Sequence, residues 1–495
     1  MLLLGIDLGT SSIKVSIVDA ATANVLVSVQ FPETETAILS RHPGWAEQSP
    51  EVWWENVRQA IRIAHAKGGQ EGHGGYDPAE IAAIGISYQM HGLVLVDAAQ
   101  GVLRDSIIWC DSRAVEYGAR AFAAIGEERC LSRLLNSPGN FTASKLAWVK
   151  DVEPSVYSQV NKMMLPGDFI SMRMTGEVTT SVSALSEGVL WDFAADAVSA
   201  DVLDYFGFPS SIIPEIRPLF GSHGGLRADV AKELKLRPGI PVSYKAGDQP
   251  NNALSLNVLE PGEVAATAGT SGVIYGVSGA ATYDPQSRVN SFAHVNYSSG
   301  SPRVGVLLCI NGTGILNRWI RDLAGGDYGK LNAEALAIPA GSEGLTVLPF
   351  GNGAERIFGN KIIGAQLLNI DLNVHRAAHL YRAGQEGIAF AFRYGLDIMR
   401  ENGMVPSVIR AGKANMFLSP VFCAAFVNAT GVPVELYNSD GSVGAALGAG
   451  IGAGIFPDQK AAFAGLKPLD LITPTKAGEY GELYGKWRGE LERFL

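Results

Sequence analysis

The sequence contains few cysteines and no long apolar run. Its four cysteines are scattered over 495 residues and form no CxxC pair, which is typical of a reducing compartment. The longest apolar tract, residues 443–456, is too short to cross a bilayer, and the N-terminus has no basic segment of the kind that opens a secretory signal. We therefore expect a soluble, cytoplasmic protein with no membrane partner. The cysteines are Cys110, Cys130, Cys309 and Cys423.

The chain also lacks an excess of positive charge. Its formal net charge is −10, so no basic field is available to bind nucleic acid, although backbone dipoles could still bind a small anion locally. Hydrophobic residues make up 47% and charged residues 18%, which is the composition of a globular protein. At this length we expect at least two domains.

Two common nucleotide-binding motifs are missing. There is no GxxxxGK[ST] loop and no GxGxxG between a strand and a helix. The segment "GIDLGTSSIK" at residues 5–14 offers a different phosphate cradle, because an apolar strand ends there in a tight turn, residues 9–12, rich in N–H and hydroxyl groups. Asp7 precedes the turn and could hold Mg²⁺ beside a phosphate. The alternative is an ordinary hairpin turn with a solvated aspartate.

The order of apolar and amphipathic segments favours an α/β fold. Strand-like runs at 81–88, 92–97 and 106–110 follow an amphipathic stretch at 50–66. The small residues of 443–456 predict a buried helix that allows another backbone to approach closely. A glycine-rich loop is expected at residues 67–77.

A second copy of the turn lies in the other half of the chain. "AGTSGVIY" at 268–275 is similar to "LGTSSIKV" at 8–15. Two strand–turn–strand phosphate loops, one in each half, imply two related lobes that face each other across a cleft. A repeat this short can arise by chance, but its position after a second strand and near a second aspartate strengthens it.

The whole pattern resembles the FGGY family of carbohydrate kinases, which belong to the actin-like ATPase superfamily. The resemblance extends over nearly the entire chain, because the segments follow in the order found in the family. They are "GIDLGTSSIK" at 5–14, "HPGWAEQSPEVWWENV" at 42–57, "SYQMHGLVLVD" at 87–97, "IIWCDSRA" at 107–114, "NFTASKLAWVK" at 140–150, "AGDQPNNAL" at 246–254, "AGTSG" at 268–272 and "RAGQEGIAFAFRYGLD" at 382–397.

This resemblance implies an α/β fold of two actin/hexokinase-like (ribonuclease H-like) lobes with a central cleft. Residues 1–245 would form the sugar-binding lobe with the first phosphate loop, and residues 246–495 the nucleotide-binding lobe with the second. The implied reaction is Mg²⁺- and ATP-dependent phosphorylation of a ketopentose. The Met-His-Gly at residues 90–92 favours D-xylulose, converted to D-xylulose 5-phosphate, while L-ribulose, a polyol or glycerol are alternatives within the family.

The resemblance also assigns roles to residues. Asp248 would be the general base and Asp7 the magnesium ligand, and both count as catalytic. The expected sugar contacts are Met90, His91, Gly92, Trp109, Asp111 and Asp248. The expected phosphate and nucleotide contacts are Thr10, Ser11, Lys14, Gly269, Thr270, Gly312, Gly412 and Asn415.

Several of these residues have a structural alternative. Asp248 could be a turn residue, Lys14 a solvated strand residue and His91 a satisfied structural histidine. Asp111 could form an ion pair with Arg113 rather than contact sugar.

The segment "RAGKAN" at 410–415 departs from the family, which usually has a glycine-rich adenosine loop there. Arg410 and Ala411 add side chains beside Gly412, so nucleotide preference is open. A catalytically inactive, sugar-sensing relative is therefore a second hypothesis, although the retained aspartates and threonines argue against it. An actin-like filament or chaperone ATPase is a third. The oligomeric state is open, with a homodimer as one candidate.

Overall fold

The computed structural model of the protein describes residues 1–68 and 75–495, and these fall into two compact units. Most of the expected glycine-rich loop at 67–77 lies outside the described residues. No helix in the described part of the chain is long and apolar enough to cross a membrane. Each unit collects three segments, 1–259, 292–304 and 440–466 in the first and 260–291, 305–439 and 467–495 in the second.

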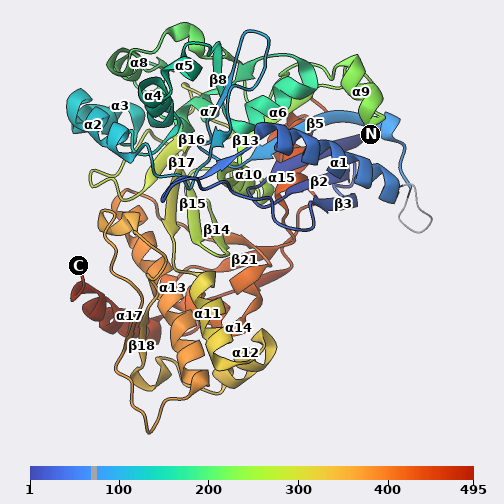
Figure 1. Cartoon of the computed structure of the whole chain (residues 1–495). Helices are drawn as coiled ribbons and strands as arrows, with labels where there is room; N and C mark the ends of the chain where they lie inside the picture. Colours follow the sequence, from blue (N-terminus) through green and yellow to red (C-terminus); the bar gives the residue numbers. More distant parts are fainter. Residues whose placement is uncertain (69–74) are drawn as a thin grey trace. The chain divides into compact units, whose positions relative to one another are not determined.

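The first unit is organised around a five-stranded sheet with the order β13-β5-β1-β2-β3 (Figure 1). β1 pairs in parallel with β5, which pairs in parallel with β13, while β1, β2 and β3 form an antiparallel meander. The strand expected at 81–88 is confirmed, whereas the runs at 92–97 and 106–110 each contain only a short strand. The strands are β1 (Leu2–Leu8), β2 (Ile13–Asp19), β3 (Val25–Phe31), β4 (Glu47–Gln48), β5 (Ile81–Tyr88), β6 (Val94–Val96), β7 (Ser106–Ile107), β8 (Lys162–Met164), β9 (Thr179–Thr180), β10 (Trp191–Asp192), β11 (Ala197–Val198), β12 (Glu215–Ile216) and β13 (Val242–Gly247).

Helices and loops surround this sheet. The amphipathic stretch at 50–66 forms α1, in which Pro50 occupies the first turn and Trp53, Val57 and Ile61 face the core at helical spacing. The helices of the unit are α1 (Pro50–Gly68), α2 (Val115–Ile125), α3 (Glu127–Leu134), α4 (Thr142–Val152), α5 (Pro154–Tyr157), α6 (Pro166–Thr175), α7 (Val182–Glu187), α8 (Ala200–Phe206), α9 (Ala228–Leu234), α10 (Asp248–Ser255), α15 (Gly441–Gly452) and α16 (Gln459–Ala462).

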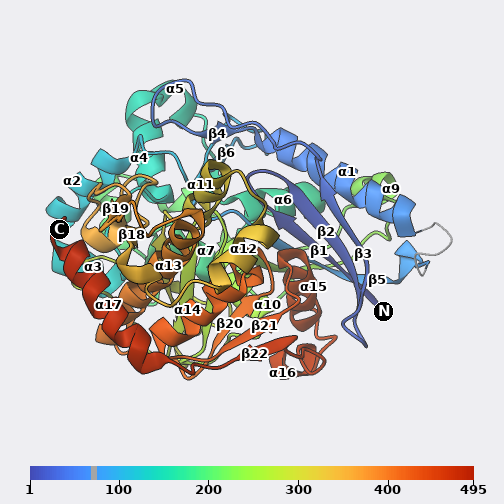
Figure 2. The ribbon, with the colours of Figure 1, turned by 90° about the horizontal axis from the view of Figure 1, so that it is seen from below.

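The small-residue tract at 443–456 forms most of α15, which lies against β1 and β5 (Figure 2). The strands meet it at glycines: a Cβ on Gly5 would lie 1.8 Å from the carbonyl oxygen of Ser442, and one on Gly85 would lie 1.9 Å from that of Ala445. Any side chain at these two positions would push the helix off the sheet. The expectation of a buried helix in close backbone contact is therefore confirmed.

The second unit contains a seven-stranded sheet with the order β16-β17-β15-β14-β20-β21-β22. β14 and β15 form an antiparallel hairpin, and β14, β20 and β21 run in parallel. This repeats the arrangement of β1, β2, β5 and β13, so the two units are related in topology, as the sequence repeat predicted. The strands are β14 (Val264–Ala268), β15 (Gly272–Ser278), β16 (Asn290–Ala293), β17 (Val304–Ile310), β18 (Thr346–Leu348), β19 (Gln366–Leu368), β20 (Ile409–Gly412), β21 (Val434–Tyr437) and β22 (Asp470–Ile472).

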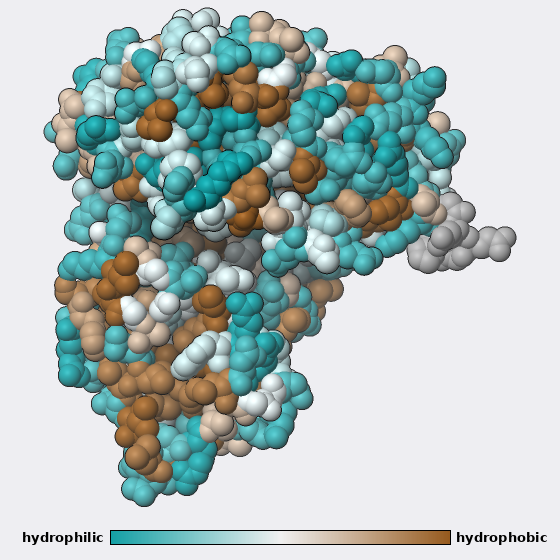
Figure 3. All heavy atoms as spheres, viewed as in Figure 1, coloured by the Kyte–Doolittle hydropathy of each residue, from teal (hydrophilic) through white to brown (hydrophobic). Residues whose placement is uncertain are grey.

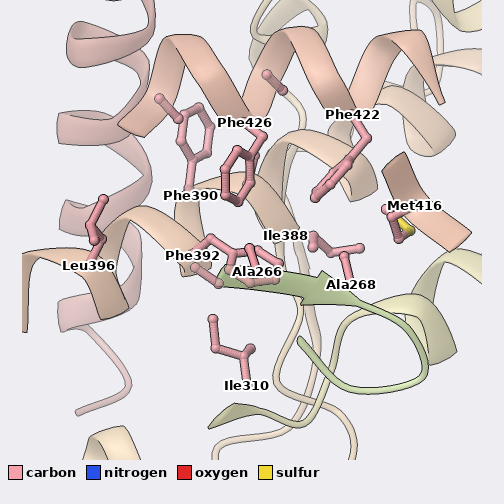
Figure 4. Packing of buried hydrophobic residues seen from close by; sticks show 14 of the residues in the cluster. Ala266, Ala268, Ile310, Ile388, Phe390, Phe392, Leu396, Met416, Phe422 and Phe426 are labelled. Atoms are coloured by element: carbon pink, nitrogen blue, oxygen red, sulfur yellow. The ribbon is translucent and has the colours of Figure 1, made fainter. Parts of the chain in front are cut away.

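Aromatic side chains fill the core of the second unit. Figure 4 shows Phe422 and Phe426 above the strand that carries Ala266 and Ala268. The alanines on β14 leave room for rings that pack edge to face, such as Phe392 and Phe426, whose centroids are 5.2 Å apart. The helices are α11 (Gly314–Ala324), α12 (Tyr328–Leu336), α13 (Ala377–Glu401), α14 (Pro420–Thr430) and α17 (Ala477–Glu492).

The second unit also exposes large apolar side chains, and Figure 3 shows apolar residues gathered on its surface. Such surface is common on proteins that associate with themselves. The homodimer expected as one candidate stays a prediction. The exposed residues include Trp319, Leu323, Leu336, Ile362, Ile370, Leu372 and Leu418.

Candidate functional site

The first candidate element is the turn between β1 and β2. The Gly9 N–H donates to the Ser12 carbonyl at 3.1 Å and closes the turn. Among the described residues, the backbone N–H groups of Thr10, Ser11 and Ser12 donate to no other protein group. A cluster of uncommitted N–H groups at a tight turn is what an oxyanion needs, so this geometry is suited to phosphate.

The side chain of Thr10 is held in a polar network. Its hydroxyl donates to Gln89 Oε1 at 3.2 Å and accepts from Trp109 Nε1 at 2.9 Å. Gln48 Nε2 donates to the Thr10 carbonyl at 2.8 Å, and Gln48 Oε1 accepts from Gln89 at 3.1 Å and from Trp53 at 3.0 Å. The Thr10 hydroxyl is thus engaged in fixing the turn.

Charged side chains surround the same turn. Asp7 and Lys14 are opposite each other in the β1–β2 register, and Lys14 Nζ lies 3.1 Å from Asp440 Oδ2 at the N-terminus of α15. Burial raises the pKa of Asp7, and the charge of Asp440 raises it further. A Cβ on Gly441 would lie 2.4 Å from Asp7 Oδ2, so the start of α15 packs directly on this carboxyl.

Asp440 itself is ionised more readily than usual. Burial opposes its charge, but hydrogen bonds from Ser442 and the positive charge of Lys14 outweigh that effect and hold its pKa below the ordinary value. The Ser442 N–H and hydroxyl both reach Asp440 Oδ1, at 2.9 and 2.6 Å. Asp7 and Asp440 therefore provide carboxylate oxygens of the kind that Mg²⁺ binds with water and phosphate. Among the described residues no cluster of three metal-ligating side chains is present.

Asp248 is the first residue of α10, directly after the parallel strand β13. Burial raises its pKa to about 7, the carboxylate of Asp7 adds to that effect, and hydrogen bonds with Gln249 work against it. A carboxylate that titrates near neutral pH is matched to accepting a proton from a hydroxyl group. Asp7 and Asp248, which lie 241 positions apart in the sequence by subtraction, are thus electrostatic neighbours.

The segment Met90-His91-Gly92 follows β5, the strand between β1 and β13. His91 Nδ1 lies 3.0 Å from the carbonyl oxygen of Glu187, so Nδ1 carries the proton and donates it. The ring packs on Phe141 and Phe292, with centroids 4.8 and 5.4 Å away. These contacts fix the orientation of the imidazole ring.

A buried lysine joins this segment to the next one. Lys145 on α4 donates from Nζ to the carbonyl oxygens of His91 at 2.8 Å and Ile108 at 3.0 Å. Burial lowers the pKa of Lys145 to about 7, with the charge of Asp111 acting in the opposite direction. The lysine ties the Met-His-Gly segment to the loop that carries Trp109.

Trp109 and Asp111 differ in environment. The Trp109 side chain is 52% exposed, and its Nε1 donates to the Thr10 hydroxyl. Asp111 is buried and accepts from the backbone N–H of Ala46 at 2.6 Å and from the Arg113 guanidinium at 2.6 and 2.9 Å. The ion pair that the sequence left as an alternative is therefore present, and contact of Asp111 with sugar stays a prediction.

The second turn, between β14 and β15, is held by backbone groups rather than charges. The Gly314 N–H donates to the Gly269 carbonyl at 2.8 Å, and the Ile315 N–H donates to the Thr270 carbonyl at 3.2 Å. A Cβ on Gly314 would lie 2.3 Å from that Gly269 oxygen. The N-terminus of α11 is thus fixed against the turn.

The loop before α11 is also closely packed. A Cβ on Gly312 would lie 1.6 Å from the carbonyl oxygen of Pro349, so only glycine fits there. The Glu355 carboxylate accepts from the Asn311 N–H at 3.0 Å. Burial raises the pKa of Glu355 to about 7, although this backbone donor and that of Gly312 lower it.

A cavity of about 370 Å³ opens beside the second turn. Three polar lining residues are joined by a network: Ser419 Oγ donates to Asn332 at 2.7 Å and lies 2.8 Å from Oε1 of the buried Gln385, whose Nε2 is 3.3 Å from Asn317. The volume and mixed lining suit a nucleoside. The lining residues are Ala268, Gly269, Thr270, Gly314, Ile315, Asn317, Arg318, Tyr328, Asn332, Tyr381, Asn415, Met416, Leu418 and Ser419.

The segment at 410–415, which differs from the usual family sequence, lies partly outside the lining of this cavity. Arg410 pairs with Glu263 at 3.1 Å and with Glu435 at 3.2 Å, and neither it nor Gly412 lines the cavity. Asn415 does line it, with a left-handed backbone (φ 53°). The arginine side chain is therefore engaged on the sheet rather than placed in the cavity.

The sequence reasoning missed several residues that hold these sites. Gln48, Gln89, Lys145, Glu187 and Asp440 were not assigned roles. Lys145 had a detectable signal, because its neighbours in the first two turns of α4, residues 142–149, are apolar or small. Asp440 had none, because its relation to Lys14 depends on two segments 426 residues apart.

Comparison with known proteins identifies the family of this chain. Residues 2–255 match the N-terminal domain and residues 264–454 the C-terminal domain of the FGGY family of carbohydrate kinases. The chain is 30% identical to the xylulose kinase of Escherichia coli (strain K12) over 90% of its own length and 88% of that protein. It is 30% identical to the xylulose kinase of Klebsiella pneumoniae, with 94% and 93% covered. The structure of xylulose kinase from Rhodospirillum rubrum matches with a TM-score of 0.87 and 27% identity over 100% of this chain and 99% of that one.

The α/β fold, with its repeated hairpin and parallel strands, is the two-lobed actin-like ATPase fold, and the protein is a carbohydrate kinase. The chain belongs to the FGGY family.

Proposed function

We propose that this carbohydrate kinase transfers the γ-phosphoryl group of ATP to D-xylulose and forms D-xylulose 5-phosphate. The observation that carries the proposal is Asp248, a half-buried carboxyl whose pKa is raised to about 7 at the start of α10. The similarity to xylulose kinases over most of the chain supports the choice of sugar. The Met-His-Gly segment is next to the strand that leads to Asp248.

Asp248 would accept the proton of the attacking hydroxyl. Phosphoryl transfer passes through a loose transition state, so little deprotonation is needed beforehand and the main task is orientation. His91 would contact the sugar, with its ring held in place by the bond from Nδ1 to the Glu187 carbonyl. Met90 and Gly92 would shape the floor, where a Cβ on Gly92 would lie 2.6 Å from Pro166 Cγ. Trp109 and Asp111 would border the sugar.

The first turn would bind phosphate oxygens through the N–H groups of Thr10, Ser11 and Ser12, with Lys14 nearby. Mg²⁺ would neutralise phosphate charge, and Asp7 would hold it, through water, because the ion gives up its hydration shell reluctantly. The carboxyl set at Asp7 and Asp440 fits such an ion.

The second unit would bind the nucleotide. Gly269 and Thr270 would contact phosphates, Gly312 would keep the α11 loop close, and Asn415 would approach the base in the cavity. Gly412 would leave space at the edge of β20, where a Cβ would have no atom nearer than Ser439 Cβ at 3.8 Å. The division into a sugar-binding part, 1–245, and a nucleotide-binding part, 246–495, concerns these ligands and is part of the proposal. So are a cytoplasmic location and a homodimer.

The test is ADP release with ATP and Mg²⁺ across D-xylulose, L-ribulose, polyols, gluconate and glycerol, run beside the Asp248→Asn variant. We expect the highest kcat/KM with D-xylulose and a loss of about 100-fold or more in the variant. Preference for another sugar would replace the substrate. An active Asp248→Asn enzyme would overturn the base, and sugar binding without ADP release would favour the inactive sensor.

A further inference from the structure

Glu187 has a buried carboxyl group that the proposed mechanism does not use. It is the last residue of α7 and only 1% exposed. Among the described residues, neither carboxyl oxygen makes a hydrogen bond of regular geometry. Leaving a buried polar group unsatisfied is costly, so such a group calls for an explanation.

The position of this carboxyl is unusual. A Cβ on Gly247 would lie 2.6 Å from Glu187 Oε2 and 2.6 Å from Met90 Cγ, so the carboxyl lies against the residue before Asp248 and beside Met90. The backbone carbonyl of Glu187 also accepts from His91 Nδ1 at 3.0 Å. Glu187 therefore lies beside two segments of the proposed sugar site, the one that follows β5 and the one at the end of β13.

The cations near Glu187 are engaged by other groups, although the charge of Lys145 still acts on it. Asp168, which also faces it, is paired with Lys245 at 2.7 Å, and Lys145 commits its ammonium to two carbonyl oxygens. Among the described residues no cation forms an ion pair with Glu187. Burial and the charges of Asp248 and Asp168 raise the pKa of the Glu187 carboxyl group, whereas the backbone N–H of His91 and the Tyr88 hydroxyl point toward that group and act in the opposite direction.

Two neighbouring carboxyl groups in a buried site do not both ionise readily. Burial raises the pKa of Glu187 well above its usual value, and the charge of Asp248 raises it further. Asp248 is half-buried and hydrogen-bonded to Gln249, whereas Glu187 is fully buried. The proton of the pair therefore belongs on Glu187.

We propose that Glu187 is a positioning residue of the sugar site and acts as an uncharged carboxylic acid. Its side chain packs against Gly247 beside Met90, and its backbone carbonyl fixes the His91 ring. This inference rests on the proposed role of Asp248 as the base. Because Glu187 carries no charge, Asp248 is the carboxyl that ionises as the pH rises.

The first test is Glu187→Gln, which has the shape of the neutral acid and carries no charge at any pH. We expect kcat/KM within about threefold of the parent and an acid limb of the pH profile at the same position. If Glu187 is instead ionised, removing its negative charge would move that limb down by about one pH unit and overturn the proposal.

The second test removes the support. In Glu187→Ala we expect KM for the sugar to rise about tenfold, because Gly247 and Met90 lose their contact, with recovery in Glu187→Gln. The matched control is Ser186→Ala, one residue away, which loses a bond to the Ser183 carbonyl at 2.8 Å and one from the Ala293 N–H at 2.9 Å. It should lower thermal stability without changing KM. A Glu187→Ala enzyme that behaves like the control would overturn the positioning role.

A third measurement needs no turnover and separates this inference from the proposed function. The infrared difference spectrum between the parent and Glu187→Gln at neutral pH should contain the carbonyl stretch of one protonated carboxylic acid, in addition to the absorption of Asp248 and Glu355 that both enzymes share, and Asp248→Asn should keep this band. Absence of that band overturns the inference even if the enzyme phosphorylates D-xylulose. An active Asp248→Asn enzyme would overturn the base while the band remained.

Discussion

The two hairpins of this protein share a backbone plan but differ in chemistry. β1–β2 and β14–β15 each join antiparallel strands through a short turn, and each first strand pairs in parallel with a later one. The first turn lies among Asp7, Lys14 and Asp440. The second turn is held by α11 through backbone hydrogen bonds and a glycine at close approach.

This difference indicates how a duplicated element acquires two tasks. Charged groups near the first turn can hold a metal ion and tune the pKa of Asp248, which is what phosphoryl transfer requires. A turn fixed only by backbone groups can hold phosphates without affecting proton transfer. We therefore expect substitutions at the first hairpin to act mainly on kcat and those at the second mainly on nucleotide binding.

The largest expected effect is that of Asp7→Asn. Loss of the carboxylate removes the proposed magnesium ligand, and we expect kcat to fall by about 100-fold or more, measured as ADP release at saturating sugar and ATP. Thr270→Val on the second hairpin is the matched comparison and should raise KM for ATP with a smaller change in kcat. Equal losses in kcat for the two variants would contradict the division of tasks.

A pair of glycine substitutions sharpens the same comparison. Gly441→Ala would place a Cβ 2.4 Å from Asp7 Oδ2, and Gly314→Ala would place one 2.3 Å from the Gly269 oxygen. We expect about tenfold lower kcat in the first and about tenfold higher KM for ATP in the second. Gly485→Ala is the control, because a Cβ there would meet no atom within 4 Å and alanine favours the helix α17. The prediction is wrong if both variants change the same constant.

The pH profile provides a third test. Asp248 must be ionised to act as a base, and since its pKa is raised to about 7, kcat/KM should fall as the pH decreases below about 7. The charge of Asp7 contributes to that shift, so the remaining activity of Asp7→Asn should have its acid limb at lower pH. Thr270→Val should leave the limb in place. A limb that moves in the second-hairpin variant and not in the first would reverse the comparison.

Most of the fold could be predicted from local patterns. The strand at 81–88 is a short apolar run, the helix at 50–66 is amphipathic, and the small residues of the tract at 443–456 indicated its close packing. The repeated Gly-Thr turn predicted the relation between the units. The composition of each unit could not be predicted, because residues 440–466 return to the first unit after a long excursion through the second.

The site residues that stand in short motifs could be predicted from the sequence, whereas those that act through tertiary contacts could not. Asp7, Met90, His91 and Asp248 stand in recognisable segments. Glu187 lies in a segment without a recognisable motif, and its contact with Gly247 depends on how α7 packs beside β13. The ion pairs of Arg410 were also not visible in the sequence, since Glu263 directly precedes β14 and Glu435 is on β21.

The smallest expected effect is on the free energy of unfolding, where Thr10 in the first hairpin and Thr270 in the second should differ. Thr10→Val would remove a hydrogen bond to Gln89 and one from Trp109, and leave the Gln89 oxygen in a partly buried network without this donor. We expect a loss of about 1–2 kcal/mol in the free energy of unfolding, seen as a fall of a few degrees in the melting temperature. Among the described residues the Thr270 hydroxyl makes no hydrogen bond within the protein, so Thr270→Val should change stability by less than about 0.5 kcal/mol. Equal losses would mean that the first turn does not depend on its polar network, and the contrast between the hairpins would then be one of charge alone.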